Sequence, residues 1–264
     1  MNLSLENKNA LVGGSTQGIG LAVAQILAEM GAKLTLVARN EDKLKEVITT
    51  LATPYQQNHT YIVADYEFPE QLADKTKQFI TQNKIDTWDI LVNNTGGPAG
   101  GSLLDASADM LRNAYTQHLI CNQILAQIFV PLMKKKGQGR IVNIISTSVK
   151  EPLENLGVSN TTRWAVASWA KTLATELASF NITVNNILPG ATQTARIDFI
   201  LNSKSKKENI SVEEAKKEME KTIPMKRFAE PKEIANGVAF FVSDLASYIT
   251  GTSLAIDGGR TKSM

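Results

Sequence analysis

The sequence predicts an α/β fold with a single doubly wound parallel sheet and helices on both faces. Two observations support this prediction. Short apolar segments with strand character alternate along the 264 residues with amphipathic segments of helical spacing. The first strand-like segment runs directly into a glycine-rich turn, and a helical pattern follows that turn. Ligands of such sheets bind beyond the carboxyl ends of the strands, so we expect the site at that edge.

The elements follow one another without a repeat or a low-complexity segment, so we expect one domain of the Rossmann type over residues 1–264. The strand-like segments are residues 9–12, 33–38, 61–65, 89–93, 140–146, 183–188 and 253–257. Helical patterns cover residues 108–135 and 161–179, and a helix over 103–125 would be long enough to pack against another subunit.

One segment differs from the rest in composition. Residues 202–221, after the sixth strand, are rich in Lys, Glu and Ser and fall on the ligand side of the sheet. Two interpretations are open: a mobile helical lid over a substrate, within about residues 193–226, or a solvated surface helix.

Composition restricts the function classes. The chain is 43% hydrophobic and 20% charged, with a net charge of +2, which gives no electrostatic case for binding nucleic acid or membranes. The N-terminus has no apolar signal region, and no apolar run reaches membrane-spanning length. The single cysteine, Cys121, excludes an internal disulfide and lies on an apolar helical stripe, as a buried structural thiol does. We therefore expect a cytoplasmic protein with a small-molecule ligand and predict no metal site.

The most informative motif is the glycine turn, Gly14-Ser15-Thr16-Gln17-Gly18-Ile19-Gly20. A glycine turn between a strand and a helix brings backbone N–H groups to a phosphate, and the helix N-terminus adds about half a positive charge. A Cβ would block the turn or the approach of a pyrophosphate. A tight turn without a ligand is the alternative, but this context favours a nucleotide.

The second strand identifies the nucleotide. It ends at Arg39, about twenty residues after the glycines, where a dinucleotide fold meets the adenosine ribose. An acidic residue there would bind the 2′-hydroxyl, whereas an arginine favours a 2′-phosphate. Arg39 therefore predicts NADP(H), unless it is only a solvated residue at a strand end.

With Asn93-Asn94-Thr95-Gly96 after the fourth strand, the chain resembles the short-chain dehydrogenase/reductase family, from the glycine turn to residues 257–259. Residues 227–231 and 248–251 are similar to segments of bacterial 3-oxoacyl-acyl carrier protein reductases. The resemblance implies that the cofactor is held by the glycine turn and by Arg39, Asp65, Tyr66, Asn93, Thr95, Gly96, Arg163, Pro189, Gly190, Thr192 and Thr194. For Asp65 a strand-end cap is the alternative, and for Asn93 a polar brace between strands.

The family's chemistry needs a serine, a tyrosine, a lysine four residues after the tyrosine, and an asparagine on the long helix. Ser146 matches the serine, but Ser159 stands at the tyrosine position, Arg163 at the lysine position and His118 at the asparagine position. No tyrosine lies between residues 115 and 248, so the usual acid is absent. In the family, positive charge contributes roughly 4 kcal/mol to bring a tyrosine pKa near 10 towards neutrality.

The remaining groups leave several roles open. Ser146 either donates a hydrogen bond to a carbonyl or caps a strand end, and Arg163 can hold ribose hydroxyls but cannot shuttle protons. Ser159 is a weak acid. The proton would come from His118, from a water ordered by the two serines, or from Lys150. His118 is alternatively an interior residue, and Lys150 a surface loop residue.

Two functions follow as expectations. The first is an NADP(H)-dependent oxidoreductase that transfers a hydride to or from a carbonyl or alcohol substrate, with Ser146, Ser159, Arg163 and His118 at the reacting end. The second is a catalytically inactive NADP(H)-binding or sensing protein of the same fold. The resemblance also implies a homo-oligomer, by family analogy a tetramer.

Overall fold

A single seven-stranded parallel sheet forms the centre of the computed structural model, which describes residues 3–263. The strands are β1 (Asn9–Gly13), β2 (Lys33–Ala38), β3 (Thr60–Val63), β4 (Ile90–Asn93), β5 (Gly139–Ile144), β6 (Ile182–Pro189) and β7 (Ser253–Ile256). Their order is β3-β2-β1-β4-β5-β6-β7, so the direction of winding reverses between β1 and β4. The predicted doubly wound fold is confirmed, and its switch point lies at the carboxyl ends of β1 and β4.

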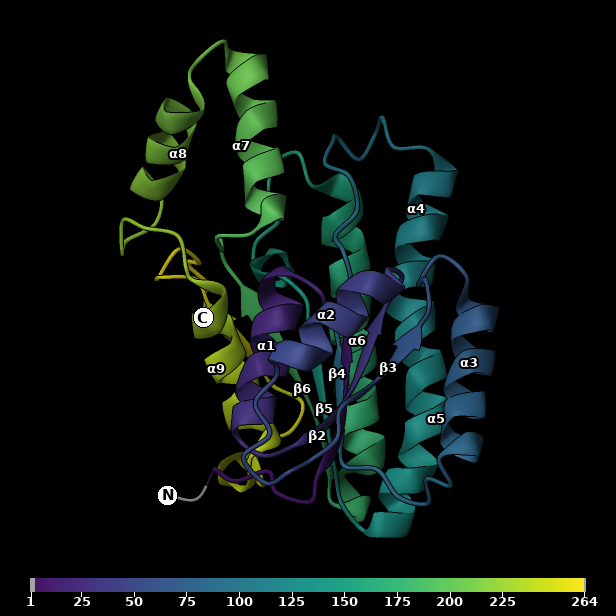
Figure 1. Cartoon of the computed structure of the whole chain (residues 1–264). Helices are drawn as coiled ribbons and strands as arrows, with labels where there is room; N and C mark the ends of the chain where they lie inside the picture. Colours follow the sequence, from purple (N-terminus) through teal and green to yellow (C-terminus); the bar gives the residue numbers. More distant parts are fainter. Residues whose placement is uncertain (1–2, 264) are drawn as a thin grey trace.

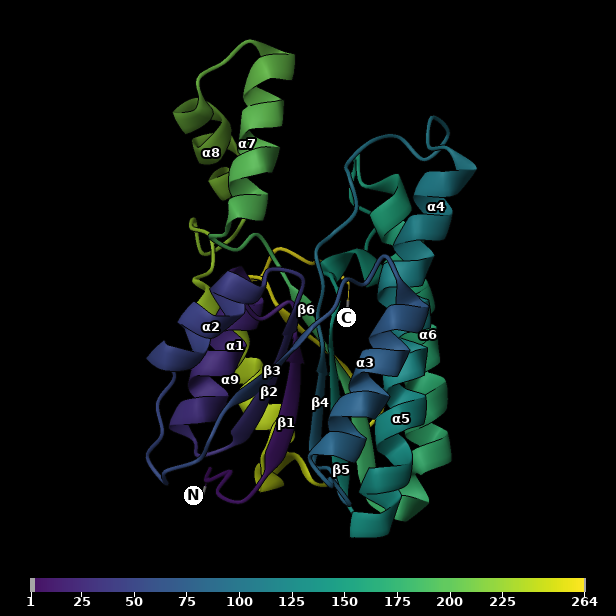
Figure 2. The same ribbon diagram turned by 45° about the vertical axis from the view of Figure 1, so that its right-hand side comes forward.

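Helices cover both faces of the sheet, as Figures 1 and 2 show. They are α1 (Gly18–Glu29), α2 (Glu41–Thr50), α3 (Pro69–Gln82), α4 (Ala108–Tyr115), α5 (Cys121–Lys136), α6 (Gly157–Leu177), α7 (Ala195–Glu208), α8 (Val212–Lys221) and α9 (Pro231–Val242). Val12 faces the core under α1, α2 and α9, whereas its neighbour Leu11 faces the core under α3, α5 and α6. Alternate residues of one strand thus supply the two cores, which explains why the strands read as continuous apolar runs.

The long helix expected over residues 108–135 is interrupted. α4 and α5 are joined by a π-helical turn, Thr116–Ile120, and His118 lies within it. Ser107 caps α4 by accepting a hydrogen bond from the Met110 backbone N–H at 3.2 Å, so the expectation of a helix over 103–125 was wrong at its start. Apolar spacing does not reveal a single π-helical turn, because the pattern on either side stays helical.

Several strands end earlier than expected, and this places polar residues in loops. β5 ends at Ile144, and Ser146 lies beyond it as the cap of a 3₁₀ turn, Thr147–Val149. Asp65 lies beyond the end of β3. α6 begins at Gly157, before the predicted start at residue 161, so that Ser159 occupies its first turn.

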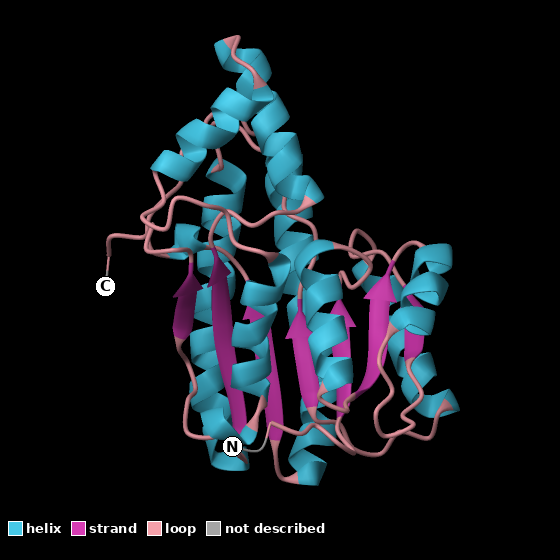
Figure 3. Ribbon diagram, turned by 60° about the vertical axis from the view of Figure 1, so that its left-hand side comes forward, coloured by secondary structure: helices cyan, strands magenta, loops and turns pink. Residues whose placement is uncertain are grey.

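α7 and α8 form a helical hairpin that stands beyond the carboxyl ends of the strands (Figures 1 and 3). Residues 202–221 are thus parts of two helices, not one. A capping box of Ser211 and Glu214 begins α8. The hairpin has its own apolar cluster, which includes Leu201, Ala215 and Phe228.

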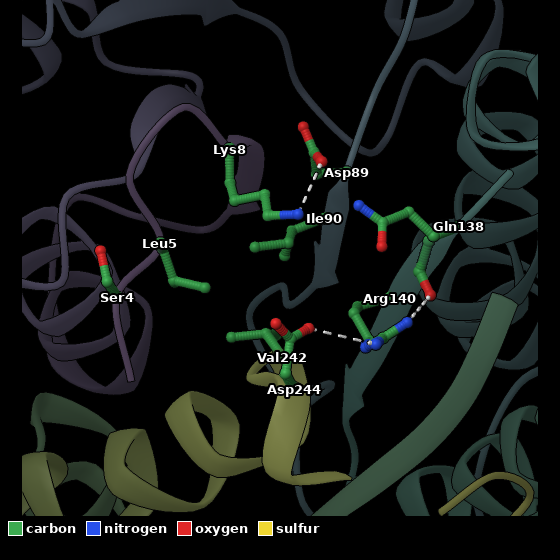
Figure 4. Close-up of a pocket in the computed structure, with 10 residues that line it drawn as sticks. Ser4, Leu5, Lys8, Asp89, Ile90, Gln138, Arg140, Val242 and Asp244 are labelled. Carbon is green, nitrogen blue, oxygen red and sulfur yellow. Dashed lines mark hydrogen bonds and ion pairs between the residues drawn. The ribbon is translucent and has the colours of Figure 1, made fainter. Parts of the chain in front are cut away.

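The opposite edge of the sheet holds a small polar cavity, shown in Figure 4. Asp89 is 3% exposed there and pairs with Lys136 at 2.6 Å and Lys8 at 3.7 Å. Arg140 pairs with Asp244 at 3.6 Å. The cavity has a volume of about 20 Å³, enough for roughly one water molecule. Its ion pairs connect the starts of β1, β4 and β5. Because ligands of doubly wound sheets bind at the carboxyl ends of the strands, we expect the functional site at the other edge.

Candidate functional site

The glycine turn between β1 and α1 is built for close approach. Gly14 and Gly18 have φ angles of +56° and +55°, which favour glycine. A Cβ on Gly20 would lie 2.1 Å from the Gly14 carbonyl oxygen. The side chain of Gln17, the N-cap residue of α1, makes no capping hydrogen bond, so the first N–H groups of the helix are left for a ligand. This cradle fits a phosphate group.

The other side chains of the turn have different surroundings. Ser15 is fully buried, and its hydroxyl donates to the Val37 carbonyl at 3.4 Å, which ties the turn to β2. Ile19 packs against the core beneath α1. Thr16 is half-buried and Gln17 is exposed, so these two side chains border the cradle.

The two asparagines after β4 perform separate tasks. Asn94 donates to the carbonyls of Gly13 and Gly14 at 3.1 and 3.4 Å and thereby holds the glycine turn. Asn93 points to the other face of the sheet and donates to Asn143 at 2.9 Å. The polar brace considered for Asn93 is therefore present. Sequence analysis did not assign the contact of Asn94, although the alternation of a strand could have indicated it.

Asn93 begins a ladder of amides across the sheet. Asn143 donates to Asn186 at 2.9 Å, and Asn186 donates to the Ser253 hydroxyl at 3.0 Å. The three asparagines are 2%, 0% and 3% exposed. The ladder runs from the carboxyl ends of β4 and β5 through the middle of β6 to the first residue of β7, and it stiffens the sheet beneath the site.

The adenosine side of the cradle carries an exposed ion pair. Arg39 lies 3.8 Å from Asp65, with side chains 74% and 28% exposed. Asp65 also accepts a hydrogen bond from the Glu67 backbone N–H at 3.0 Å, which is the capping role considered above. The Tyr66 side chain is buried beneath Gly13, and burial raises the pKa of its phenol. Tyr66 therefore offers only its main chain to a ligand.

The segment after β6 lies against the glycine turn. Pro189 ends β6, and Thr192 donates to the Gly190 carbonyl at 3.1 Å. Thr194 donates to the Thr192 carbonyl at 3.3 Å. A Cβ on Gly18 would lie 3.1 Å from the Thr194 methyl carbon. Gly18 and Thr194 therefore lie close together, and a side chain at position 18 would crowd Thr194.

The two serines and Arg163 meet at the end of β5. The Ser146 hydroxyl oxygen accepts a hydrogen bond from the Ser148 backbone N–H at 3.1 Å, which leaves its proton to be donated elsewhere. Ser159 and Arg163 lie one turn apart on α6, and both are buried. Arg163 Nη1 donates to the Ile144 carbonyl at 3.0 Å. The cap considered for Ser146 is present, and it leaves a donor available.

His118 lies beside this cluster and is 3% exposed. Its ring donates to the Gly96 carbonyl; burial and then the positive charge of Arg163 hold the histidine pKa well below 6.5. His118 is therefore uncharged at neutral pH. Thr95 and Gly96 belong to a loop that is half-buried and then exposed. Burial and then the charge of Arg196 lower the pKa of Arg163 to about 10.

Arg196 is a site residue that sequence analysis missed. It lies in the first turn of α7, and its Nη2 donates to the Pro98 carbonyl at 2.6 Å. A Cβ on Gly97 would lie 3.8 Å from Arg196 Nε. An available signal was its position, because a basic residue in the first turn opposes the helix dipole and needs another reason to be there.

Lys150 and Cys121 are two further groups near the site that carry reactive side chains. Lys150 is half-buried and follows the 3₁₀ turn. Cys121 donates to the Tyr66 carbonyl at 3.3 Å, and burial raises the pKa of its thiol to about 12, so it is not a thiolate. Within residues 3–263, no three His, Cys, Asp or Glu side chains gather to hold a metal ion. Across the same residues, no helix combines the length and apolar character needed to span a bilayer.

Comparisons with known proteins agree with this geometry. A family model described as enoyl-(acyl carrier protein) reductase matches residues 14–261. NADPH-dependent reductase BacG of Bacillus subtilis is 30% identical, over 98% of this chain and 100% of its own. Dehydrogenase/reductase SDR family member 4 of Sus scrofa is 31% identical, over 97% of this chain and 88% of its own.

A solved structure is similar along the whole chain. L-sorbose reductase from Gluconobacter frateurii, complexed with NADPH and L-sorbose, superposes with a TM-score of 0.92 at 30% identity and covers 100% of both chains. The seven-stranded order, the glycine cradle and these matches together show that this chain belongs to the short-chain dehydrogenase/reductase family.

Proposed function

We propose that this protein is an NADP(H)-dependent oxidoreductase that acts on a carbonyl or alcohol substrate. One observation carries the proposal: the glycine cradle and Ser146 lie at the same carboxyl edge of the sheet. The cradle is open for a phosphate only because Gly20 has no Cβ. BacG is an NADPH-dependent reductase and the L-sorbose reductase is complexed with NADPH, and both support the choice of cofactor.

The residues present fit the cofactor from end to end. Residues 14–20 would hold the pyrophosphate, Arg39 the 2′-phosphate, and Asp65 with the main chain of Tyr66 the adenine. Toward the nicotinamide, the residues that would contact it or its ribose are Asn93, Thr95, Gly96, Arg163, Pro189, Gly190, Thr192 and Thr194. When bound, the reduced cofactor supplies a hydride.

Ser146 would polarise the substrate oxygen. Its oxygen accepts a hydrogen bond from the Ser148 N–H, so its O–H is available to donate to a carbonyl. Arg163 adds positive charge where negative charge develops on that oxygen. A water held between Ser146 and Ser159 would supply the proton, since the Ser159 hydroxyl makes no hydrogen bond within residues 3–263.

His118 would position the site. Its N–H is held by the Gly96 carbonyl, and an uncharged imidazole has no second proton to give. We therefore expect His118→Gln, which retains an amide donor, to keep more activity than His118→Ala. An equal and severe loss in both variants, with a shift of the acidic limb of the pH–rate profile, would instead support proton transfer by His118.

The proposed activity is tested by following NADPH oxidation against ketones, diketones and acyl thioesters. The thioesters test the resemblance to 3-oxoacyl-acyl carrier protein reductases. Ser146→Ala should lower kcat/KM by about 100-fold, which is the effect of removing one donor to a developing oxyanion. Ser168→Ala, an exposed serine on α6, is the matched control. Equal rates in the two variants would refute the role of Ser146.

A second candidate is an NADP(H)-binding protein without turnover. It is favoured by the occupants of the reacting end, because Ser159 and Arg163 stand where the family resemblance places a tyrosine and a lysine. Quenching of NADPH fluorescence without oxidation across the whole panel would support it. Gain of activity in the Ser159→Tyr, Arg163→Lys double variant would show that the rest of the site is competent.

Two further features complete the proposal. The α7–α8 hairpin, within residues 193–226, would serve as a substrate lid, because Arg196 connects it to the Pro98 loop. We also propose a homo-oligomer, a tetramer by family analogy. A groove of about 650 Å³ lined by Leu103, Tyr115 and the half-exposed Trp164 supports an apolar interface with a second copy. Trp164→Glu should lower the mass measured by light scattering, and an unchanged mass would exclude this face.

A further inference from the structure

Two arginines near the reacting end have no acidic partner. Arg163 and Arg196 each donate to one main-chain carbonyl, those of Ile144 and Pro98. The buried Arg163 Nε has no hydrogen-bond partner in the described part of the chain. Over residues 3–263, no carboxylate forms an ion pair with either guanidinium, and Asp198, two residues after Arg196, is exposed.

Two glycines, Gly96 and Gly97, lie between the surroundings of Arg163 and those of Arg196. Gly96 accepts a hydrogen bond from His118, whose pKa senses the charge of Arg163. The next residue, Gly97, lies against the Arg196 side chain. No atom comes within 4 Å of the place where a Cβ on Gly96 would lie. This loop therefore leaves open space for a small ligand next to the Arg196 side chain.

The charge of this region is not compensated. A guanidinium stays protonated in proteins, and a buried cation without a counter-ion is costly. Burial, and after it the positive charge of Arg196, lowers the pKa of Arg163, so the two charges also repel each other. The proposed function already assigns the cofactor phosphates to the glycine cradle and to Arg39. It assigns Arg163 to the ribose and to the reacting oxygen, so Arg196 is the arginine that is left without an anionic partner.

We propose that the substrate is an oxo acid, or the corresponding hydroxy acid, whose carboxylate binds Arg196, with the positive charge of Arg163 nearby, while its carbonyl oxygen reaches Ser146. This inference rests on the proposed function and names its substrate class. A carboxylate suits the position because its two oxygens match the planar fork of a guanidinium. Arg196 is the specificity-determining residue, because its side chain comes from α7 and the proposed function gives it no contact with the cofactor.

The test compares kcat/KM for short oxo acids with kcat/KM for their methyl esters, at the same NADPH concentration. We expect the acid to be preferred in kcat/KM, and Arg196→Gln to reduce that preference roughly 10- to 100-fold, the range for a lost charge-assisted hydrogen bond. Because Arg196→Gln also removes the hydrogen bond to the Pro98 carbonyl, we expect the ester rate to fall as well, and the readout is the ratio of acid to ester kcat/KM. The NADPH dissociation constant should change by less than about twofold. Arg112→Gln, which removes an exposed arginine of α4, is the control of equal net charge.

A binding measurement separates this inference from the proposed activity. Titration calorimetry of the same acids into the NADP⁺-loaded protein should give binding that Arg196→Gln weakens and Arg196→Lys retains in part. Such binding without any turnover would refute the oxidoreductase and leave the anion site standing. Unchanged acid affinity in Arg196→Gln would overturn the inference. So would a selective loss of NADPH affinity, which would assign the charge to a cofactor phosphate.

Discussion

The amide ladder offers a direct test of how the sheet supports the site. Asn143 occupies its centre, where it accepts from Asn93 and donates to Asn186, both at 2.9 Å. Substitution Asn143→Leu removes both hydrogen bonds. Leucine fills a similar volume, so a water molecule has no room to replace the lost amide.

The magnitude follows from what remains buried. The Asn93 amide nitrogen and the Asn186 amide oxygen each lose a partner, and both residues are at most 3% exposed. An orphaned buried polar group costs about 1–3 kcal/mol, so the pair costs about 4 kcal/mol. The apolar leucine side chain returns about 1.5 kcal/mol. We therefore expect the free energy of unfolding to fall by about 2.5 kcal/mol.

Urea unfolding, followed by circular dichroism at equal protein concentration, measures this loss. Thr183→Val is the matched control, because the Thr183 hydroxyl is buried on β6 without a hydrogen-bond partner in the described chain. Its removal deletes an orphaned polar group, so it should leave stability unchanged or raise it by up to about 1–3 kcal/mol. We also expect Asn143→Leu to weaken NADPH binding, since Asn93 precedes the residue that holds the glycine turn. A stability equal to that of Thr183→Val would refute the structural role of the ladder.

Three more predictions concern the cofactor and the response to pH. Arg39→Asp should weaken NADPH binding roughly 10- to 100-fold and NADH binding far less, and equal losses in fluorescence titrations would contradict the 2′-phosphate assignment. The pKa of His118 is depressed, so below pH 6.5 the unfolded chain takes up a proton that the folded chain does not. The free energy of unfolding should thus decrease as the pH is lowered below 6.5, by up to about 1.4 kcal/mol per pH unit. His118→Gln should flatten that slope more than His59→Gln does at the half-buried His59. Gly20→Ala should abolish NADPH binding, whereas Gly137→Ala, where a Cβ meets no atom within 4 Å, should leave it intact in the same titration.

The fold could be predicted because its signals are local. The strands between the two edges of the sheet are buried on both faces and read as short apolar runs, and the glycine turn marks the start of α1. The parallel order then follows from the alternation of strands and helices. The π-helical turn at Thr116–Ile120 was missed because apolar spacing continues through it. The early start of α6 was missed because Leu156, its N-cap residue, makes no side-chain capping bond.

The candidate site could be predicted only in part. The cradle is a backbone structure, and glycine spacing expresses its geometry directly. Asn94 and Arg196 act across gaps of about 80 and 98 residues, and no local pattern reports such contacts. The state of His118 also depends on tertiary structure, since its pKa follows from burial and from the charge of Arg163. Sequence therefore indicated which residues to consider, but not which charges face one another.

That distribution of charge bears on the direction of the proposed reaction. Oxidised nicotinamide carries a positive charge and reduced nicotinamide does not, so the uncompensated charges of Arg163 and Arg196 disfavour the oxidised form at this edge. A bound carboxylate would neutralise that effect and bring the substrate carbonyl to Ser146. The same two arginines would thus favour binding of NADPH first and an anionic oxo acid second. An uncharged ketone would leave both cations unpaired, which is why the acid–ester comparison is the decisive measurement for this site.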